Sequence, residues 1–268
     1  MNAREAFQAA QLQQAISLGI EAVRANPADR GKRTFLFELL VFAGELDRAS
    51  RQLEAIAPSD PDEAIAIEVY RSCLAAERAR REVFTGSGLP EFRVDPPEYA
   101  GFHVQCLERL RRGDAAGAAA ALAEARSRWG ELAGSRGDAP FTGFRDLDDL
   151  TAPFLEVFDR GSYVWVPLER LRSISVRAPK FPRDLIWAPT EITLHNGQVG
   201  QVFVPVLYPM TTTSSASTDA HRLGRTTDWI EPAPGLMAGI GHRMFLVGDQ
   251  DVSVLELGTV LLSEPQAG

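Results

Sequence analysis

Two short breaks divide the first half of the chain in the same way, and this repetition constrains the fold more than any other feature. The segment AGELDRASRQLEAIAPSDP at 43–61 resembles RGDAAGAAAALAEARSRW at 112–129, since each has a glycine-acidic turn before an Ala-rich run. Gly44 and Gly113 are 69 residues apart, about two periods of the 34-residue tetratricopeptide unit. An earlier segment, LQQAISLGIEAVRANPAD, has Pro27 where such a repeat usually stops. The pattern predicts a degenerate tetratricopeptide-like array of roughly three helix pairs, because stacked pairs bury faces that one pair leaves exposed.

The segments between these breaks are rich in strong helix formers, mainly Ala, Leu, Glu, Gln and Arg. TFLFELLVFA at 34–43 is apolar nearly all round except at Glu38, which predicts a helix in the middle of the array. Cys73 and Cys106 are the only cysteines, and both lie in predicted helices. Further ligands at metal-binding spacing are absent around them, so we expect buried thiols.

Arginines gather at two places in the helical half, Arg78-Arg80-Arg81 and Arg109-Arg111-Arg112. Both clusters are expected near helix C-termini, where the helix dipole favours cations. A surface that grips an acidic partner is the alternative.

The composition changes after Gly161 to Val, Ile, Trp and Tyr with many prolines. Asn196-Gly197 and Gly248-Asp249 are typical hairpin turns, and PLERLRS at 167–173 reads as a single helical turn between strands. The expected fold class is α+β with two domains. A tetratricopeptide-like helical domain spans 1–133, and a small, mostly antiparallel β-rich domain, a barrel or a sandwich, spans 134–268. The expected strands are SYVWVP, RSISVRAP, ITLHNGQVGQVFVPVLYP, HRMFLVGDQDVSVLEL and TVLLS.

Three acidic residues, Asp146, Asp148 and Asp149, crowd together in FRDLDDLTAPFLEVF. We expect them at the start of a short apolar helix, where the dipole favours negative charge. Binding of Mg²⁺ or Ca²⁺ is the weaker alternative, because the glycine and further oxygen ligands of a calcium loop are missing.

The net charge of −8 is spread along the chain, with 17 basic and 20 acidic residues before position 134 and 11 and 16 after it. Nucleic acids and anionic membranes bind clustered Lys and Arg, so neither is expected as a partner. The sequence has no apolar run of signal-peptide type and no long apolar stretch. We therefore expect a cytoplasmic protein.

Motifs for catalysis or cofactor binding are weak. The chain has no GxSxG nucleophile elbow. Gly239-Ile240-Gly241 lacks the third glycine and the helix of a dinucleotide site. Its four histidines form no HxH or HxxxH pair. No metal and no cofactor are expected.

RLGRTTDW at 222–229 is the segment that most resembles an active site. A hydrolase or phosphotransferase would use Asp228, Arg225 and the preceding His221 as base and anion clamp, if a pocket held them. In the competing structural interpretation, Gly224 supplies a turn, Arg225 pairs with Asp228, and Trp229 covers that pair.

Several motifs in a fixed order resemble the ImpE/SciE family, also called TagJ, of type VI secretion accessory proteins. They are FRDLDDLTAPFLEVF, GSYVWVPLERL, RDLIWAP, LYP, LGRTTDW and GIGHRMFLVGD. The resemblance implies a helical N-terminal domain, a β-containing C-terminal domain and no known enzymatic activity. It also implies binding to a helix of the small sheath subunit of the TssB type, and a link to the ClpV AAA+ ATPase.

The leading hypothesis is therefore a non-enzymatic adaptor that accepts an amphipathic helix in a groove of the array or at the junction of the domains. A homo-oligomeric scaffold is a third hypothesis. The candidate binding residues are Phe144, Arg145, Asp146, Asp148, Arg225, Asp228 and Trp229.

Overall fold

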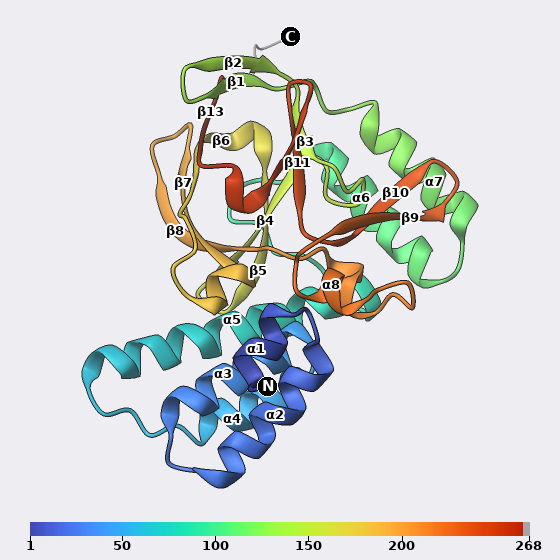
Figure 1. The fold of residues 1–268 in the computed structure, drawn as a ribbon. Helices are drawn as coiled ribbons and strands as arrows, with labels where there is room; N and C mark the ends of the chain where they lie inside the picture. The colour runs from blue at the N-terminus through green and yellow to red at the C-terminus, as the bar shows by residue number, and fades with distance from the viewer. Residues whose placement is uncertain (265–268) are drawn as a thin grey trace.

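The computed structural model describes residues 1–264. Helices form the N-terminal part and lie below and beside a β-rich C-terminal part (Figure 1). This arrangement confirms the predicted α+β class, with helices first and an antiparallel β-rich region after them. The helices of the N-terminal part are α1 (Ala3–Gln8), α2 (Leu12–Ala25), α3 (Arg30–Phe42), α4 (Leu46–Glu54), α5 (Pro61–Thr85), α6 (Glu98–Arg111) and α7 (Ala115–Arg126), and a short helix, α8 (Asp219–Arg222), lies within the β-rich part.

The ends of these helices are set by residues that the sequence marks. The carboxylates of Asp29, Asp60 and Asp114 each accept a hydrogen bond from a backbone N–H in the first turn of the helix that follows. Gly44 and Gly113 have φ angles of +78° and +75°, which favour glycine, and they make the turns of two helix hairpins. The similarity between the two breaks therefore reflects the same local structure.

Neighbouring helices pack as hairpins: α1 on α2, α3 on α4, and α6 on α7. Between the second and third hairpins runs α5, whose 25 residues make it the longest helix among residues 1–264. It contacts α4 and α6 as well as strands of the β-rich part. Thus α5 is the element that joins the helical part to the rest. None of the described helices is long and apolar enough to cross a membrane.

All paired strands of the β-rich part run antiparallel, in three sheets. The largest has the order β2-β1-β13-β6-β7-β8-β4-β5, the second β12-β11-β3, and the third is the hairpin β10-β9. The first strands are β1 (Ala133–Arg136), β2 (Ala139–Thr142), β3 (Phe144–Asp146), β4 (Phe154–Asp159), β5 (Ser162–Pro167) and β6 (Leu171–Val176). They are followed by β7 (Trp187–Leu194), β8 (Val199–Pro205), β9 (Thr227–Ala233), β10 (Leu236–Gly241), β11 (Met244–Val247), β12 (Gln250–Ser253) and β13 (Thr259–Leu262).

The predicted turns at Asn196-Gly197 and Gly248-Asp249 are confirmed, since they join β7 to β8 and β11 to β12. PLERLRS does contain one helical turn, the 3-10 helix Leu168–Arg170. The apolar helix expected after Asp149 was wrong, because FLEVF lies in strand β4. Both faces of β4 are buried, and a strand buried on both faces shows a continuous apolar run that periodicity cannot distinguish from a helix.

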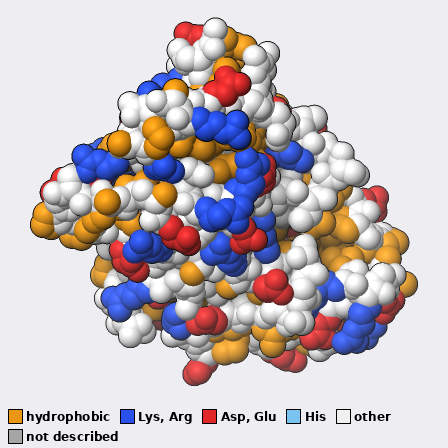
Figure 2. Space-filling view, turned by 90° about the horizontal axis from the view of Figure 1, so that it is seen from below, with side chains coloured by type: hydrophobic (Ala, Val, Ile, Leu, Met, Phe, Trp, Pro, Cys, Tyr) orange, Lys and Arg blue, Asp and Glu red, His pale blue; other side chains and the backbone are white. Residues whose placement is uncertain are grey.

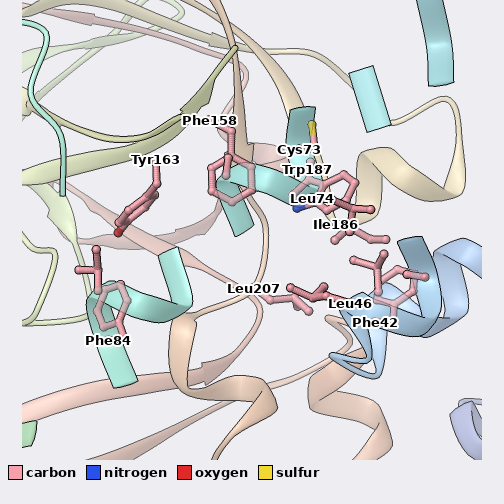
Figure 3. Close-up of a cluster of buried hydrophobic side chains, with 14 of the residues drawn as sticks. Phe42, Leu46, Cys73, Leu74, Phe84, Phe158, Tyr163, Ile186, Trp187 and Leu207 are labelled. Atoms are coloured by element: carbon pink, nitrogen blue, oxygen red, sulfur yellow. The ribbon is translucent and has the colours of Figure 1, made fainter. Parts of the chain in front are cut away.

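One hydrophobic cluster extends from the helices into the β-rich part. Phe42 and Leu46, Cys73 and Leu74 of α5, and Trp187 of β7 all belong to it (Figure 3). As predicted, the helix around 34–43 is central, with every residue from 35 to 42 buried. A second cluster lies inside the β-rich part and unites its two larger sheets. Separate domains divided at 133/134 stay a prediction.

Candidate functional site

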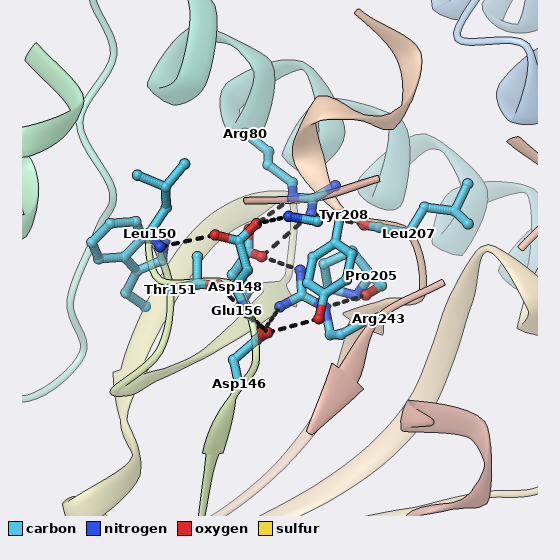
Figure 4. A network of polar contacts seen from close by, with 12 residues as sticks. Arg80, Asp146, Asp148, Leu150, Thr151, Glu156, Pro205, Leu207, Tyr208 and Arg243 are labelled. Atoms are coloured by element: carbon cyan, nitrogen blue, oxygen red, sulfur yellow. Dashed lines mark hydrogen bonds and ion pairs between the residues drawn. The ribbon is translucent and has the colours of Figure 1, made fainter. Parts of the chain in front are cut away.

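A buried network of ionic groups lies where α5 meets the sheet (Figure 4). Glu156 of β4 is its centre and has no exposed surface. Nε of Arg80 on α5 donates to its Oε1 at 2.8 Å, and Arg243, just before β11, pairs with its Oε2. Arg80 also donates to the carbonyl oxygen of Leu207 at 2.9 Å. One carboxylate therefore connects a helix of the N-terminal part with two segments of the β-rich part.

Asp146 extends this network on the other side of Arg243, with which it forms a fully buried ion pair. Nε of Arg243 donates to the carbonyl oxygen of Pro205 at 2.9 Å. The hydroxyl of Tyr208 donates to Asp146 at 3.1 Å, and the backbone N–H of Asp148 donates to the same carboxylate at 2.9 Å. Every charged group of the set is thus paired, as buried charges must be.

The neighbouring charges shift the pKa of these acids in opposite directions. Burial alone would raise the pKa of Glu156, but the guanidinium groups of Arg243 and Arg80 lower it to about 2. Burial, reinforced by the charge of Asp146, raises the pKa of Asp148 to about 8. Glu156 is therefore anionic at neutral pH. Because Glu156 has no exposed surface, its carboxylate stabilises the fold and is not accessible to a substrate as a base.

Most of this network was not anticipated from the sequence. Arg80 was expected to sit near a helix C-terminus, but α5 continues to Thr85 and the arginine is only 3% exposed. Glu156 and Arg243 belong to none of the motifs that indicate a site in the sequence. The signal in the sequence is a charged residue within or beside an apolar segment, FLEVF for Glu156 and RMFLV for Arg243, because a charge buried there requires a partner of opposite charge.

RLGRTTDW and the short segment before it hold the first two helices in place. Arg225 donates to the carbonyl oxygens of Phe7 and Gln8, at 2.6 and 2.7 Å, at the end of α1. Asp219 accepts a hydrogen bond of 2.8 Å from the backbone N–H of Leu12, the first residue of α2. The two side chains thus clamp both helix ends at the α1–α2 turn, where helix dipoles favour these charges. The expected Arg225–Asp228 pair was wrong, because the carbonyls of α1 occupy the guanidinium instead.

Asp228 pairs with His221, with 2.9 Å between Oδ2 and Nε2. The other ring nitrogen, Nδ1, accepts a hydrogen bond of 3.0 Å from the backbone N–H of Thr218. His221 is buried, whereas the Asp228 side chain is 69% exposed. Trp229 follows on β9, is 38% exposed and lies 5.6 Å from the ring of Tyr208. Of the candidate residues, Arg225, Asp228 and Trp229 are the exposed ones.

The remaining candidates lie on or next to β3. Phe144 is buried and stacks on Phe245 with ring centroids 5.5 Å apart. Arg145 is partly exposed and donates to the carbonyl oxygen of Asp146 at 2.9 Å. Asp148 is fully buried and accepts hydrogen bonds from the backbone N–H groups of Leu150 and Gly239. The cluster of acidic residues therefore shapes a turn between β3 and β4.

The two glycines of the GIG motif allow segments to approach each other closely. A Cβ on Gly239 would lie 2.2 Å from the Tyr208 ring. A Cβ on Gly241 would lie 2.0 Å from the carbonyl oxygen of Thr226. The φ angle of Gly241 is +97°, which also favours glycine. The motif is thus explained by packing. Among residues 1–264, no group of three or more His, Cys, Asp or Glu side chains is placed to hold a metal.

Surface charges are mixed on the face seen from below in Figure 1. Figure 2 shows basic side chains next to acidic ones on this face, with hydrophobic side chains gathered at several places. A small apolar hollow of about 260 Å³ lies between α3, α4, α5 and the segment before β7. We call it the array groove; its lining residues are Thr34, Leu53, Ile56, Glu63, Ala66, Ile67, Tyr70, Phe181 and Arg183.

The comparisons with known proteins agree with the motifs of the β-rich part. The model of the family described as ImpE protein matches residues 138–261. A Pseudomonas aeruginosa protein named type VI secretion system accessory component TagJ is 34% identical over 257 residues, which cover 96% of this chain and 89% of that protein. The chain belongs to the ImpE family.

The ImpE-matched region contains Asp146, Glu156, Tyr208 and Arg243, while Arg80 comes from the helices before it. A crystal structure of a Vibrio parahaemolyticus protein has the same fold, with a TM-score of 0.89, 24% identity and 98% of each chain covered. That similarity supports the whole architecture, helices included.

Proposed function

We propose that this ImpE-family protein is a non-enzymatic, cytoplasmic adaptor of a type VI secretion system that binds a helix of the small sheath subunit of the TssB type. The observation that carries the proposal is the 34% identity to the TagJ accessory component over almost the whole chain. In the same proposal, the bound adaptor modulates how a ClpV-type AAA+ ATPase handles the sheath. Both partners follow from the family resemblance.

The array groove supports this role because apolar side chains in it are flanked by charged ones, which is the pattern that binds an amphipathic helix. Its floor is formed by apolar side chains of α4 and α5, including Leu53 and Ile67, and its edges carry Glu63 and Arg183. Phe181 stands at the rim and is 55% exposed. Helix-in-groove binding uses such an apolar trough with polar borders. An exposed aromatic side chain at the rim is a typical anchor for a partner.

The contacts of the RLGRTTDW segment favour the adaptor over a hydrolase or phosphotransferase. Arg225 is occupied by the carbonyls of α1, and both ring nitrogens of His221 have partners. Neither these two residues nor Asp228 lines any of the described hollows. An anion clamp or general base requires an accessible group beside a substrate-sized space.

Calorimetric titration of the full chain with a peptide of the N-terminal region of a TssB-type subunit tests the proposal. We expect a micromolar or lower dissociation constant for the native protein and a weaker one for Phe181→Ser. Leu89→Ser is the matched control, because Leu89 is similarly exposed, at 61%, and lies outside the array groove. Absence of heat with the native protein contradicts the function. Equal affinity of all three proteins places the helix elsewhere, and Trp229→Ser is then the next variant to test.

A further inference from the structure

Strand β8 extends beyond the end of its neighbour β4. It pairs with β7 from Val199 to Pro205, but with β4 only at Phe203, opposite Phe158. The reason is that β4 ends at Asp159 and the chain turns back into β5. Residues 199–201 therefore have a strand on one side and none on the other among residues 1–264. We call this segment the β8 edge.

The hydrogen-bonding pattern shows which backbone groups of the β8 edge are free. In the turn before it, the N–H of Leu194 donates to the carbonyl oxygen of Gln198. Hydrogen-bonded and non-hydrogen-bonded pairs alternate in an antiparallel ladder. Because Leu194 and Gln198 are a bonded pair, Thr193 and Val199 are a non-bonded pair, and the next bonded pair is Ile192 with Gly200. The N–H and C=O groups of Val199 and Gln201 consequently point away from β7, toward the open side. These two residues offer a template for one further strand.

The molecule is hollowed on both faces of the β8 edge. A hollow of about 310 Å³ borders α5 and is lined by apolar side chains that include Ile65 and Phe203. A larger hollow of about 840 Å³ lies within the curve of the sheet and is lined by valines and by Ile192. Arg160 and Gln201 line both hollows. The edge thus separates two apolar spaces.

The charged groups beside the edge leave one cation, Arg160, without a partner in the described part of the chain. Arg160 lines both hollows and forms no ion pair within residues 1–264. The other charges are matched: Arg177 donates to the side chain of Gln201 at 2.9 Å and Gln201 in turn donates to Glu191, Arg93 is paired with Glu91 and Asp159, and Glu68 of the smaller hollow is paired with Arg71. A ligand at the edge therefore meets the positive charge of Arg160, which a negative group of the ligand would match.

We propose that the β8 edge binds an extended, acidic segment of a partner protein, which pairs with Val199 and Gln201 as an additional strand. Successive side chains of a strand point to opposite faces, so consecutive apolar residues of the segment enter the two hollows. An acidic residue of the segment pairs with Arg160. The β8 edge shares no lining residue with the array groove, and the inference does not depend on the helix proposed to bind there.

The test uses fluorescein-labelled hexapeptides and the full chain, with binding followed by fluorescence anisotropy. The probe is Val-Ile-Val-Glu-Ile-Val, and the comparison peptides carry Lys in place of Glu or N-methyl groups on alternate backbone nitrogens. We expect the acidic probe to bind saturably. Loss of one or two backbone hydrogen bonds makes the N-methylated peptide about tenfold weaker. The Lys peptide is weaker because its charge is repelled by Arg160.

Two variants of the protein locate the binding. Val199→Pro removes the free N–H while leaving the bonds to β7 intact, since that N–H points away from β7. Val199→Ala keeps the N–H and is its control. We expect the dissociation constant of the acidic probe to be about tenfold higher for the proline variant than for the alanine variant. If the proline variant does not fold, the N-methylated peptide still tests backbone pairing.

Three results overturn the inference. They are the absence of saturable binding by the acidic probe, equal binding of the N-methylated peptide, and a dimer that light scattering detects in the native protein but not in Val199→Pro. The last result would make a second copy of this chain the occupant. Failure of the sheath peptide at the array groove leaves these measurements unaffected, so the two proposals fail separately.

Discussion

Arg80 on α5 and Glu156 on β4 form an ion pair of 2.8 Å although 76 residues separate them in the sequence. Their side chains are 3% and 0% exposed. Removing one partner of a buried pair leaves an uncompensated charge, which costs far more than removing an exposed pair. The pair therefore fixes the helical part to the sheet at one defined position.

Arg80→Ala is expected to destabilise the protein by about 3–5 kcal/mol, because Glu156 loses one of its two guanidinium partners. Arg78→Ala is the control on the same helix, since Arg78 pairs with Asp47 at the surface and its loss costs about 1 kcal/mol or less. Chemical denaturation followed by circular dichroism measures both. Equal losses in the two variants would show that the buried pair has no special role.

Gly241→Ala is expected to destabilise by at least about 3 kcal/mol, because the added Cβ meets the backbone oxygen of Thr226. Gly235→Ala is the control, because it introduces the backbone strain of a positive φ angle without a steric clash. Gly235 also has a positive φ, +70°, but a Cβ there meets nothing within 4 Å. We expect a cost of about 1 kcal/mol for it. Thermal unfolding of both variants decides, and similar melting temperatures would refute the packing explanation of the GIG motif.

The stability of the protein should fall as the pH rises toward neutrality because of Glu38. Burial raises the pKa of this carboxyl to about 7, and the hydroxyl of Tyr70 lies 3.2 Å away. The carboxyl of Glu38 loses its proton near pH 4.5 in the unfolded chain but only near pH 7 in the folded protein. The protonated carboxyl therefore contributes its full stability below pH 4.5, and this contribution is lost as the pH rises through 7. Glu38→Gln cannot ionise, so it should gain about 3 kcal/mol relative to the native protein between pH 5 and pH 8. A pH-independent difference between the two proteins in urea unfolding would contradict this.

Arg225→Ala should loosen α1 more than the rest of the protein. The carbonyl oxygens of Phe7 and Gln8 lose their charged donor, at a cost of about 1–2 kcal/mol. Hydrogen exchange should then accelerate in residues 3–12, while β4 and β5 keep their protection. Arg222→Ala is the control, because Arg222 forms no hydrogen bond to α1 in the described part of the chain. Uniform acceleration across the chain would rule out a local clamp.

Local sequence signals identified most elements but not the contacts between distant ones. The helix hairpins at Gly44 and Gly113 and the turn at Asn196-Gly197 depend on neighbouring residues, so their patterns were sufficient. The strand at FLEVF was misassigned, since its identity depends on pairing with β5 and β8. No periodicity contains that information.

In the candidate site, too, the local structure follows from neighbouring residues, whereas the contacts join segments that are far apart in the sequence. That RLGRTTDW forms a structural corner was foreseeable from its residue types, yet the partner of Arg225 lies 217 residues away, in α1. Likewise, Glu156 could be recognised as an isolated charge in an apolar strand. Its partners Arg80 and Arg243 come from segments 76 and 87 residues distant. Only the tertiary structure brings such groups together.

The position of β13 has a consequence for how the protein is made. This strand, Thr259–Leu262, lies between β1 and β6, and its residues pair with residues that precede them by 84 to 88 positions in β6 and by 124 to 128 positions in β1. During synthesis, the hairpin β1-β2 therefore has no sheet to join until residue 259 has left the ribosome. Arg243 is likewise synthesised long after Asp146 and Glu156, so until then their carboxylates lack this guanidinium partner and the core is incomplete. A nascent chain arrested before position 243 should accordingly depend on chaperones, whereas the α3–α4 hairpin, whose contacts are local, forms early.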